Sequence, residues 1–492
     1  MAILDFIAGD LNDFIWGWFG IALLLGTGVL MTVLTGFFQV SHFGHWMKRT
    51  IGRLFDKKVT THTGEKGSIS QFQALCTALA ATVGTGNIAG VAGAIAVGGP
   101  GAVFWMWLSA FFGMMTNYSE NVLGIYFRRR DKNGEWAGGA MYYLERGLGG
   151  KKHMKTVGRV LAILFSAFAV IASFGIGNLA QANTISGNMA ASFNIPRWVT
   201  GAVLVILAAL VVLGGLQRIA SVTEKVVPFM AATYIIGCVV IAVMKADQLG
   251  AVFASVFRYA FSARALEGGL VGQAIKMGFK RGIFSNEAGL GSSVMVHSSS
   301  NVKEPVQQGL WGIFEVFFDT IIICTMTAVV ILSSGVIDLS TGGVIASYAD
   351  MDKNTLVAQA FQNCFGNFGS MFIAIAILFF AFSTVLGWCH YGTRSWIYLF
   401  GEKSAFIYKI AFVGVVFVSS VLTDVSLPWN ISDTFNGLMM LPNLIGVLAL
   451  SPLVVKITKN YNKRTFSSAN IKPMYSQFPD IQKAQEEAEE EE

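Results

Sequence analysis

The stretch at residues 80–90, AATVGTGNIAG, lies inside a hydrophobic segment and is interrupted by three glycines. Gly84, Gly86 and Gly90 each weaken a helix by roughly 1 kcal/mol relative to alanine. Apolar sequence of membrane-spanning length surrounds the stretch on both sides. In lipid, unwound backbone is tolerated only where protein or a water-filled cavity covers it. The sequence therefore predicts a helix broken at membrane depth, whose freed N–H and C=O groups can bind a small charged solute and its coupling ion.

The composition is typical of an integral membrane protein. Of the 492 residues, 54% are hydrophobic and 13% are charged, and the mean hydropathy is +0.58. Soluble domains carry about 25% charged residues. The net charge of +6 does not indicate nucleic-acid binding, because the basic residues lie in loops rather than on one amphipathic face. The five cysteines lie mostly in apolar segments without CxxC spacing, so we expect small buried residues rather than disulfides or metal ligands.

About eleven apolar segments are long enough to cross a bilayer, which requires about 17–25 residues. They lie near residues 14–38, 69–97, 101–127, 158–190, 197–216, 226–244, 267–299, 306–335, 356–389, 405–424 and 431–455. We therefore predict an all-α integral membrane protein with one transmembrane domain, residues 1–455. The segment 246–266 is less hydrophobic and is expected outside the membrane. The tail, residues 456–492, is polar and ends in an acidic block, which predicts a disordered, solvated segment.

Lysines and arginines are concentrated in alternate loops. The loops after the first and third spans are the most basic, and the opposite loops hold few such residues. Because basic loops remain in the cytoplasm, this bias predicts an N-terminus outside and a C-terminus in the cytoplasm. That arrangement needs an odd number of spans, which agrees with eleven.

Two groups of five spans remain when the first span is set aside. They cover residues 69–244 and 267–455, and the first member of each group is interrupted. In the first group the break is VGTGN at 83–87, and in the second it is FSNEAGLG at 284–291. Corresponding broken segments in two halves indicate an inverted-repeat transporter with its binding site near the membrane midplane. Five is an odd number, so consecutive halves must have opposite orientations.

Polar residues at membrane depth gather at these breaks and in two other spans. They are Thr82, Thr85, Asn87, Gln181, Ser285, Asn286, Glu287, Ser383 and Thr384. Such residues are costly in hydrocarbon and often functional, although a lone serine or threonine commonly bonds the backbone of its own helix. Glu287 can assist proton or ion movement, or it can satisfy freed backbone N–H groups. Glu120, Glu224, Glu315 and Asp319 are expected near helix ends or in internal polar networks.

A zwitterionic amino acid suits such a site. Exposed N–H groups at the start of a half-helix can donate to its carboxylate, and freed carbonyls and side-chain oxygens can accept from its ammonium group. Sodium requires several oxygens and no cluster of acids. No Walker, HExxH, GxSxG or Ser-His-Asp pattern stands out, which argues against an ATP-driven pump, a protease and enzymatic activity in general.

Three motifs resemble the alanine or glycine:cation symporter family. They are GTGNIAGV at 84–91, GGAMYY at 138–143 and FSNEAG at 284–289, and the resemblance extends over residues 14–455. It implies a leucine-transporter-type fold, with an extra N-terminal helix, a 5+5 inverted repeat, and broken first and sixth core helices. It also implies sodium-coupled uptake of small neutral amino acids, chiefly alanine and glycine and often D-alanine. A multi-pass protein of a prokaryotic inner membrane is expected.

The same resemblance implies site residues. Those expected to bind the amino acid are Thr85, Gly86, Asn87, Phe174, Gln181, Phe284, Ser285 and Trp388, with Trp388 restricting the pocket to small side chains. Those expected to bind sodium are the carbonyls of Ala80, Val83 and Phe380 and the hydroxyls of Ser383 and Thr384.

Two other functions remain open. The first is proton-coupled symport through Glu287 or Asp319. The second is a sensor or channel that uses the same fold without coupled transport. The expected partners are the amino acid, the sodium ion and the lipid bilayer, with no nucleic acid, and we expect the protein to work as a monomer.

Overall fold

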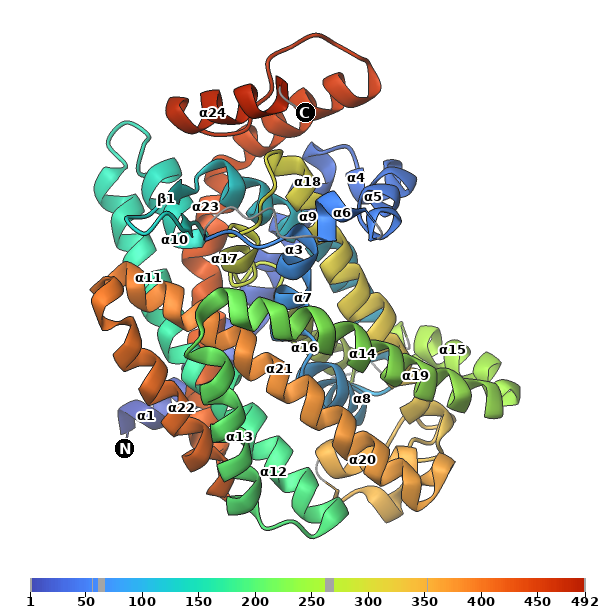
Figure 1. The fold of residues 1–492 in the computed structure, drawn as a ribbon. Coiled ribbons are helices and arrows are strands. Elements are labelled where there is room, and N and C mark those ends of the chain that lie inside the picture. The colour runs from blue at the N-terminus through green and yellow to red at the C-terminus, as the bar shows by residue number, and fades with distance from the viewer. Residues whose placement is uncertain (1, 55, 61–66, 262–269, 352, 491–492) are drawn as a thin grey trace.

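The computed structural model describes residues 2–490 except 55, 61–66, 262–269 and 352. The predicted start of the second repeat, residue 267, lies outside this part of the chain. The described chain is almost entirely helical, and its two ends lie at opposite ends of the molecule (Figure 1). This is expected for apolar segments in lipid, where a helix satisfies all of its own backbone groups.

The helices before residue 261 include both long spans and short connecting turns. They are α1 (Ala2–Phe6), α2 (Asn12–Ile15), α3 (Trp18–Leu34), α4 (Phe38–Ser41), α5 (Phe43–Arg49), α6 (Lys57–Thr60), α7 (Gln71–Thr82), α8 (Val91–Gly98), α9 (Gly101–Tyr126), α10 (Ala140–Tyr142), α11 (Lys155–Phe174), α12 (Ala180–Phe193), α13 (Arg197–Val212), α14 (Gly215–Met244) and α15 (Ala246–Ala260). A short hairpin pairs β1 (Arg129–Arg130) with β2 (Trp136–Ala137) in antiparallel register.

The helices after residue 269 complete the bundle. They are α16 (Leu270–Asn286), α17 (Val294–His297), α18 (Pro305–Val316), α19 (Thr325–Ser333), α20 (Lys353–Phe365), α21 (Asn367–Phe400), α22 (Ala405–Val421), α23 (Ser426–Phe466) and α24 (Pro479–Glu490). Wide π-helical turns join or extend several helices, at Ile7–Leu11, Gly86–Gly90, Tyr143–Leu148, Gly175–Leu179 and Phe317–Cys324. Helix α9 lies at the centre and packs against α3, α16 and α18.

The predicted spans are present as helices. Six helices in the described part of the chain are long and apolar enough to cross a membrane, or eight if each of two bent pairs is one span. Three further helices do not meet this test: α9 has 26 residues, α13 has 16 and α16 has 17. These three helices lie where the sequence predicts the third, fifth and seventh of its eleven spans.

The first predicted break is confirmed. A capping box between Ser70 and Gln73 starts α7, and the helix ends at Thr82. Val83 then leaves helical geometry, with φ −79° and ψ 86°, and the chain resumes as a wide turn that leads into α8. The two parts are bent by 52°, which is the interruption that the glycines predict.

The second predicted break is confirmed as well. Helix α16 ends at Asn286, and Glu287 has a left-handed φ of 56°. Gly289 and Gly291 also have positive φ, and the helix resumes only at Val294. Positive φ is costly for a residue with a Cβ, so Glu287 is held there by its surroundings.

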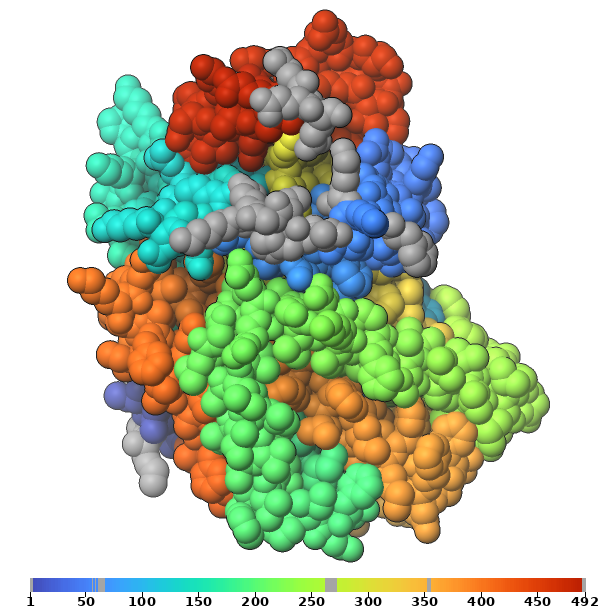
Figure 2. Space-filling view, viewed as in Figure 1, coloured from blue at the N-terminus to red at the C-terminus, as the bar shows by residue number. Residues whose placement is uncertain are grey.

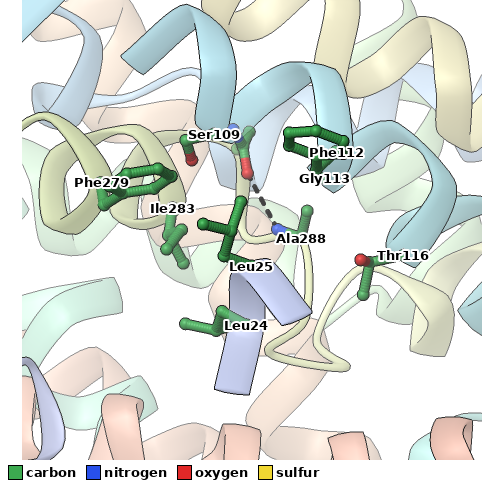
Figure 3. A pocket seen from close by; sticks show the side chains of 10 residues that line it. Leu24, Leu25, Ser109, Phe112, Gly113, Thr116, Phe279, Ile283 and Ala288 are labelled. Atoms are coloured by element: carbon green, nitrogen blue, oxygen red, sulfur yellow. Dashed lines mark hydrogen bonds between the residues drawn. The ribbon is translucent and has the colours of Figure 1, made fainter. Parts of the chain in front are cut away.

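Helix α3 supports the second break from outside the two repeats. Leu24 and Leu25 of α3 face Phe279 and Ile283 of α16 across a small pocket, where the Ala288 N–H donates to Asn286 Oδ1 (Figure 3). The pocket volume of about 10 Å³ is no more than the space of one water. It is therefore a packing gap and no site for an amino acid.

The described part of the C-terminal tail carries helical segments that contact the rest of the chain, while its disorder in solution stays a prediction from the acidic composition. Helix α23 continues to Phe466, and α24 lies across one end of the molecule, drawn in red in Figure 2. Asp480 pairs with Arg129 at 3.1 Å, and the Gln477 N–H donates to the Tyr126 carbonyl. The tail's partners, the Arg129 side chain and the Tyr126 carbonyl, lie 351 residues away in the sequence. A prediction from the composition of the tail alone does not take such contacts into account.

Candidate functional site

The Thr384 hydroxyl of α21 lies against the first break, and the neighbouring Ser383 hydroxyl lies between its own helix and Met230 Sδ. Thr384 Oγ1 is 3.1 Å from the carbonyl oxygen of Ala80 and 3.0 Å from that of Phe380. Ser383 Oγ donates to the same Phe380 carbonyl at 2.9 Å. A Cβ added to Gly84 would lie 2.4 Å from Thr384 Oγ1, so only glycine allows this approach. Hydroxyl-to-carbonyl contacts thus link four of the five residues expected to bind sodium, in the order Ala80, Thr384, Phe380 and Ser383.

The fifth residue, Val83, is the non-helical residue at the end of α7. The expected ligands are all neutral oxygens, from backbone carbonyls and hydroxyls. Within the described ranges, no group of three or more His, Cys, Asp or Glu side chains could hold a metal ion. This composition suits a weakly held monovalent cation better than a tightly bound divalent ion, which prefers carboxylates.

Asp319 connects the two breaks. The Asn87 Nδ2 group of the first break donates to Asp319 Oδ1 at 2.6 Å, and Ser285 Oγ of the second donates to Oδ2 at 2.7 Å. Asn87 also folds back onto its own break, where its Oδ1 accepts from the Gly84 N–H at 2.8 Å. The sequence placed Asp319 in a polar network or in proton coupling, and it did not indicate that this acid joins the two breaks.

Gln181 and Phe174 occupy different surroundings. Gln181 Oε1 accepts weakly from the Thr85 N–H at 3.4 Å, and its Nε2 donates to the Ile176 carbonyl, so this side chain reaches the first break. The Phe174 ring packs against Tyr408 and Phe412 of α22, at centroid distances of 5.3 and 5.7 Å. Phe174 therefore lies in the aromatic packing with α22, away from the contacts that join the other predicted residues.

Trp388 is fixed by the second break. Its side chain is buried, and its Nε1–H donates to Glu287 Oε1 at 2.9 Å. Ser292 donates to the other carboxylate oxygen of Glu287. Gly177 allows the close packing, because a Cβ there would lie 2.2 Å from the Trp388 Cβ. Glu287 thus accepts from side chains on both sides, whereas the sequence argument considered backbone N–H groups as its partners.

A cavity of about 330 Å³ reaches both breaks. Thr85, Gly86 and Phe284 are the predicted site residues that line it. Its other walls are Ala89, Gly90, Ala180, Asn183, Thr184, Lys280, Arg281, Val425, Ser426, Trp429, Asn430 and Asp433. This volume lies within the usual range of small-molecule sites, about 300–1,000 Å³. Asn87, Gln181, Ser285 and Trp388 do not line the cavity.

The opposite end of the two breaks is closed by main-chain pairing. The Ile69 N–H donates to the Ser299 carbonyl at 3.1 Å, and the Asn301 N–H donates to the Ile69 carbonyl at 2.9 Å. The Arg128 guanidinium donates to three carbonyls of the same segment, those of Ser298, Ser300 and Val302. The segments that precede α7 and follow α17 are therefore joined.

A many-span helical protein with two broken helices, a cluster of neutral oxygens at one break and a cavity leading to both is a membrane transporter. Its fold is shared with a solved structure of a Na⁺-coupled sialic acid symporter in a substrate-bound outward-open state. That structure has a TM-score of 0.53 and 13% sequence identity, and the match covers 89% of this chain and 98% of the other.

The chain belongs to the sodium:alanine symporter family, which matches residues 1–475. It is 43% identical over 462 residues to the sodium/alanine symporter AgcS of Methanococcus maripaludis, covering 94% of this chain and 98% of the relative. It is also 35% identical over 465 residues to a Bacillus subtilis protein named "Probable sodium/glutamine symporter GlnT", covering 94% and 91%. The protein is thus a multi-pass membrane transporter of the amino acid:cation symporter class and no enzyme.

Proposed function

We propose that this protein couples the uptake of small neutral amino acids, chiefly alanine and glycine, to sodium. The observation that carries this proposal is the contact between Thr384 of α21 and the Ala80 carbonyl at the first break. With Ser383 and the carbonyls of Val83 and Phe380, these groups offer five neutral oxygens to one ion. A sodium ion bound there would tie the broken helix to α21 and so favour one arrangement of the two.

The amino acid would bind where the cavity meets the breaks. Thr85 and Gly86 stand at the start of the helix segment that continues into α8, where the helix dipole favours a carboxylate and the Thr85 N–H is held only by a long 3.4 Å contact to Gln181. Gln181, Asn87, Phe284 and Ser285 would complete the site around the ammonium group and the side chain. The buried Trp388 would leave room only for a hydrogen or a methyl group.

The access pathway supports alternating access. The cavity lies at the end of the molecule where Asn12, near the N-terminus, contacts the cavity-lining Asp433 at 3.1 Å. The basic loops lie toward the other end, so we place the N-terminus outside and the C-terminus in the cytoplasm. The cavity then opens outward, while the pairing of Ile69 with Ser299 and Asn301 closes the inner side. Rocking of a four-helix bundle, which contains the broken helices of the inverted repeats 69–244 and 267–455, against the remaining scaffold would exchange the outward-open and inward-open states.

The test is uptake of radiolabelled alanine into proteoliposomes, driven by an inward sodium gradient or by an equal choline gradient. We expect accumulation only with sodium, competition by glycine and D-alanine, and little competition by glutamine. The variant Thr384→Ala should raise the sodium concentration for half-maximal uptake, and Thr384→Ser, which keeps the hydroxyl, should not. Equal downhill flux in both gradients would refute sodium coupling, and strong competition by glutamine would refute the small pocket.

Proton coupling is the main alternative. Asn87, Ser285 and Thr320 all donate hydrogen bonds to Asp319. An ionised carboxylate fits these three donors, because both of its oxygens act only as acceptors. In the alternative, Asp319 or Glu287 would take up and release the coupled proton. Uphill uptake driven by a pH gradient without sodium would favour this alternative. Binding without any net flux would favour the sensor. We also propose that the monomer is the working unit, in the plasma membrane.

A further inference from the structure

Two consecutive basic residues of α16, Lys280 and Arg281, line the cavity outward of the breaks. Lys280 is paired, because its Nζ is 2.9 Å from Asp433 Oδ2 and 3.2 Å from Asn12 Oδ1. Asn12 Nδ2 donates to the same Asp433 oxygen at 3.1 Å. One oxygen of Asp433 is therefore fully engaged, and it holds Lys280 and the N-terminal segment together.

Arg281 has no such partner. Within the described residues no hydrogen bond or ion pair reaches its guanidinium, and its Nε is enclosed without an acceptor. The guanidinium carbon lies 5.6 Å from the centroid of the Phe284 ring, which stacks on Trp429 at 6.0 Å. An unpaired cation inside a membrane-spanning helix is costly, and such residues commonly mark a substrate pathway. The guanidinium fork matches a carboxylate in particular.

Asp433 supplies the complementary charge. Its second oxygen, Oδ1, is buried and accepts no hydrogen bond, and it lies more than 4.0 Å from any Arg281 nitrogen, since no ion pair joins the two side chains. A free anion would be repelled by this carboxylate, whereas a zwitterion offers an ammonium group to it and a carboxylate to Arg281. The rings of Phe284 and Trp429 border the same cavity and provide an apolar wall.

Arg281 lies about one helical turn away from the first and second breaks. Phe284 borders Gly86, since a Cβ there would lie 3.2 Å from the Phe284 ring. Arg281 borders Gly90 in the same way, at 3.9 Å from its Cδ. Each step along either helix is about one turn, or about 5.4 Å. A ligand on Arg281 would thus lie just outward of a ligand at Thr85 and Gly86.

We propose that Arg281 and Asp433 form an outer binding site for the zwitterionic head of an α-amino acid, occupied before the amino acid moves to the breaks. This outer site rests on the proposed function, because it takes the same substrate class. It explains why Arg281 and the Oδ1 oxygen of Asp433 line the same cavity without an ion pair between them, and it adds two residues to substrate recognition that the sequence motifs do not indicate.

The test compares Arg281→Gln with Lys276→Gln in proteoliposomes that take up alanine. Lys276 carries the same charge on the same helix, but it pairs with the exposed Asp13 and does not line the cavity. We expect Arg281→Gln to raise the half-saturating alanine concentration about 10- to 100-fold, with the maximal rate and the sodium half-saturation kept. Arg281→Lys should fall between, because it retains the charge without the fork. Lys276→Gln should match the parent.

A second measurement separates recognition from a structural role. Alaninamide keeps the ammonium group and lacks the carboxylate, so Arg281→Gln should weaken competition by alaninamide much less than it weakens alanine. Equal weakening of both, or an unchanged alanine half-saturation, would overturn the proposal. Acetate that competes with the parent as well as alanine would overturn the zwitterion assignment. If the parent itself shows no sodium-driven uptake, the proposed function fails, and this outcome is separate from any effect of Arg281.

Discussion

Gly84→Ala should weaken sodium binding while leaving the fold intact. The added methyl group would lie 2.4 Å from Thr384 Oγ1, 3.3 Å from Thr384 Cβ and 3.5 Å from Gln181 Oε1. Threonine is branched at Cβ and stiff in a helix, so the hydroxyl cannot simply swing away without leaving the Ala80 carbonyl. The three nearest atoms all belong to side chains, so a rotation of the Thr384 side chain can relieve the clash without a shift of the backbone. The fold should therefore stay intact.

The size of the effect follows from the loss of one ion ligand. A hydroxyl contact with a charged group is worth about 1.5–3 kcal/mol. Each 1.4 kcal/mol changes an equilibrium constant about tenfold, so sodium affinity should fall by about 10- to 150-fold. Alanine affinity measured at saturating sodium should change far less, because the amino acid does not contact Thr384 in the proposed arrangement.

The assay is alanine uptake measured over a range of sodium concentrations, with Gly90→Ala as the matched control. Gly90 lies in the same broken helix, but its added methyl would meet nothing closer than 3.9 Å. We expect a large rise in sodium half-saturation for the first variant and the parent's value for the second. If Gly84→Ala keeps the parent's sodium dependence, Thr384 does not bind the ion and the assignment is refuted.

Three further outcomes are expected. Glu287→Leu should raise the half-saturating alanine concentration about tenfold, because the Trp388 Nε1–H loses its acceptor and a buried unsatisfied donor costs about 1–3 kcal/mol. Glu287→Gln keeps an acceptor oxygen and should stay close to the parent. Deletion of 467–492 should lower the melting temperature and leave the sodium half-saturation unchanged, since the described tail contacts Arg129 and Tyr126, which are not among the proposed sodium ligands. Burial lowers the pKa of His45 to about 4, so the stability it contributes should be complete above pH 6.5 and decline as the pH falls toward 4.

Each of these three predictions would be contradicted by a specific result. Loss of uphill uptake in Glu287→Gln would indicate that this acid carries a proton. Altered sodium dependence after the tail deletion would place the tail in the transport cycle. A His45→Gln variant should melt with a flatter pH dependence between pH 4 and 6.5, and an unchanged profile would show that folding does not lower the pKa of His45.

The broken helices could be predicted from the sequence because glycine acts locally. Three glycines weaken α7 and α8 at the place where they occur, and the second break follows from the same local chemistry around Asn286 and Gly289. The span count could also be predicted, since α16 and α9 remain mostly apolar despite their polar residues.

The side-chain network could not be predicted in the same way. Asp319 meets Asn87 across 232 positions of sequence, and Trp388 meets Glu287 across 101, so both contacts depend on how the spans pack. The position of Phe174 also could not be predicted from the sequence. An aromatic ring in an apolar helix can line a pocket, but it can equally pack against a neighbouring helix, as Phe174 does against α22. The resemblance to a family indicated several of these residues, but it did not indicate Asp319 or Arg281 as partners.

The pairing of Ile69 with Ser299 and Asn301 has a consequence for how this transporter can vary. The pairing itself uses main-chain groups, so proline at Ile69, which lacks the N–H, should break it. Ile69 is also buried in the core, so polar or bulky replacements there should cost packing energy, whereas small changes of apolar side chain should leave the pairing in place. Arg128 adds side-chain hydrogen bonds to the same segment, at the carbonyls of Ser298, Ser300 and Val302. Substitution of Arg128 should therefore loosen this closure while the main-chain pairing of Ile69 remains, so the ease of opening can vary among relatives without loss of the fold.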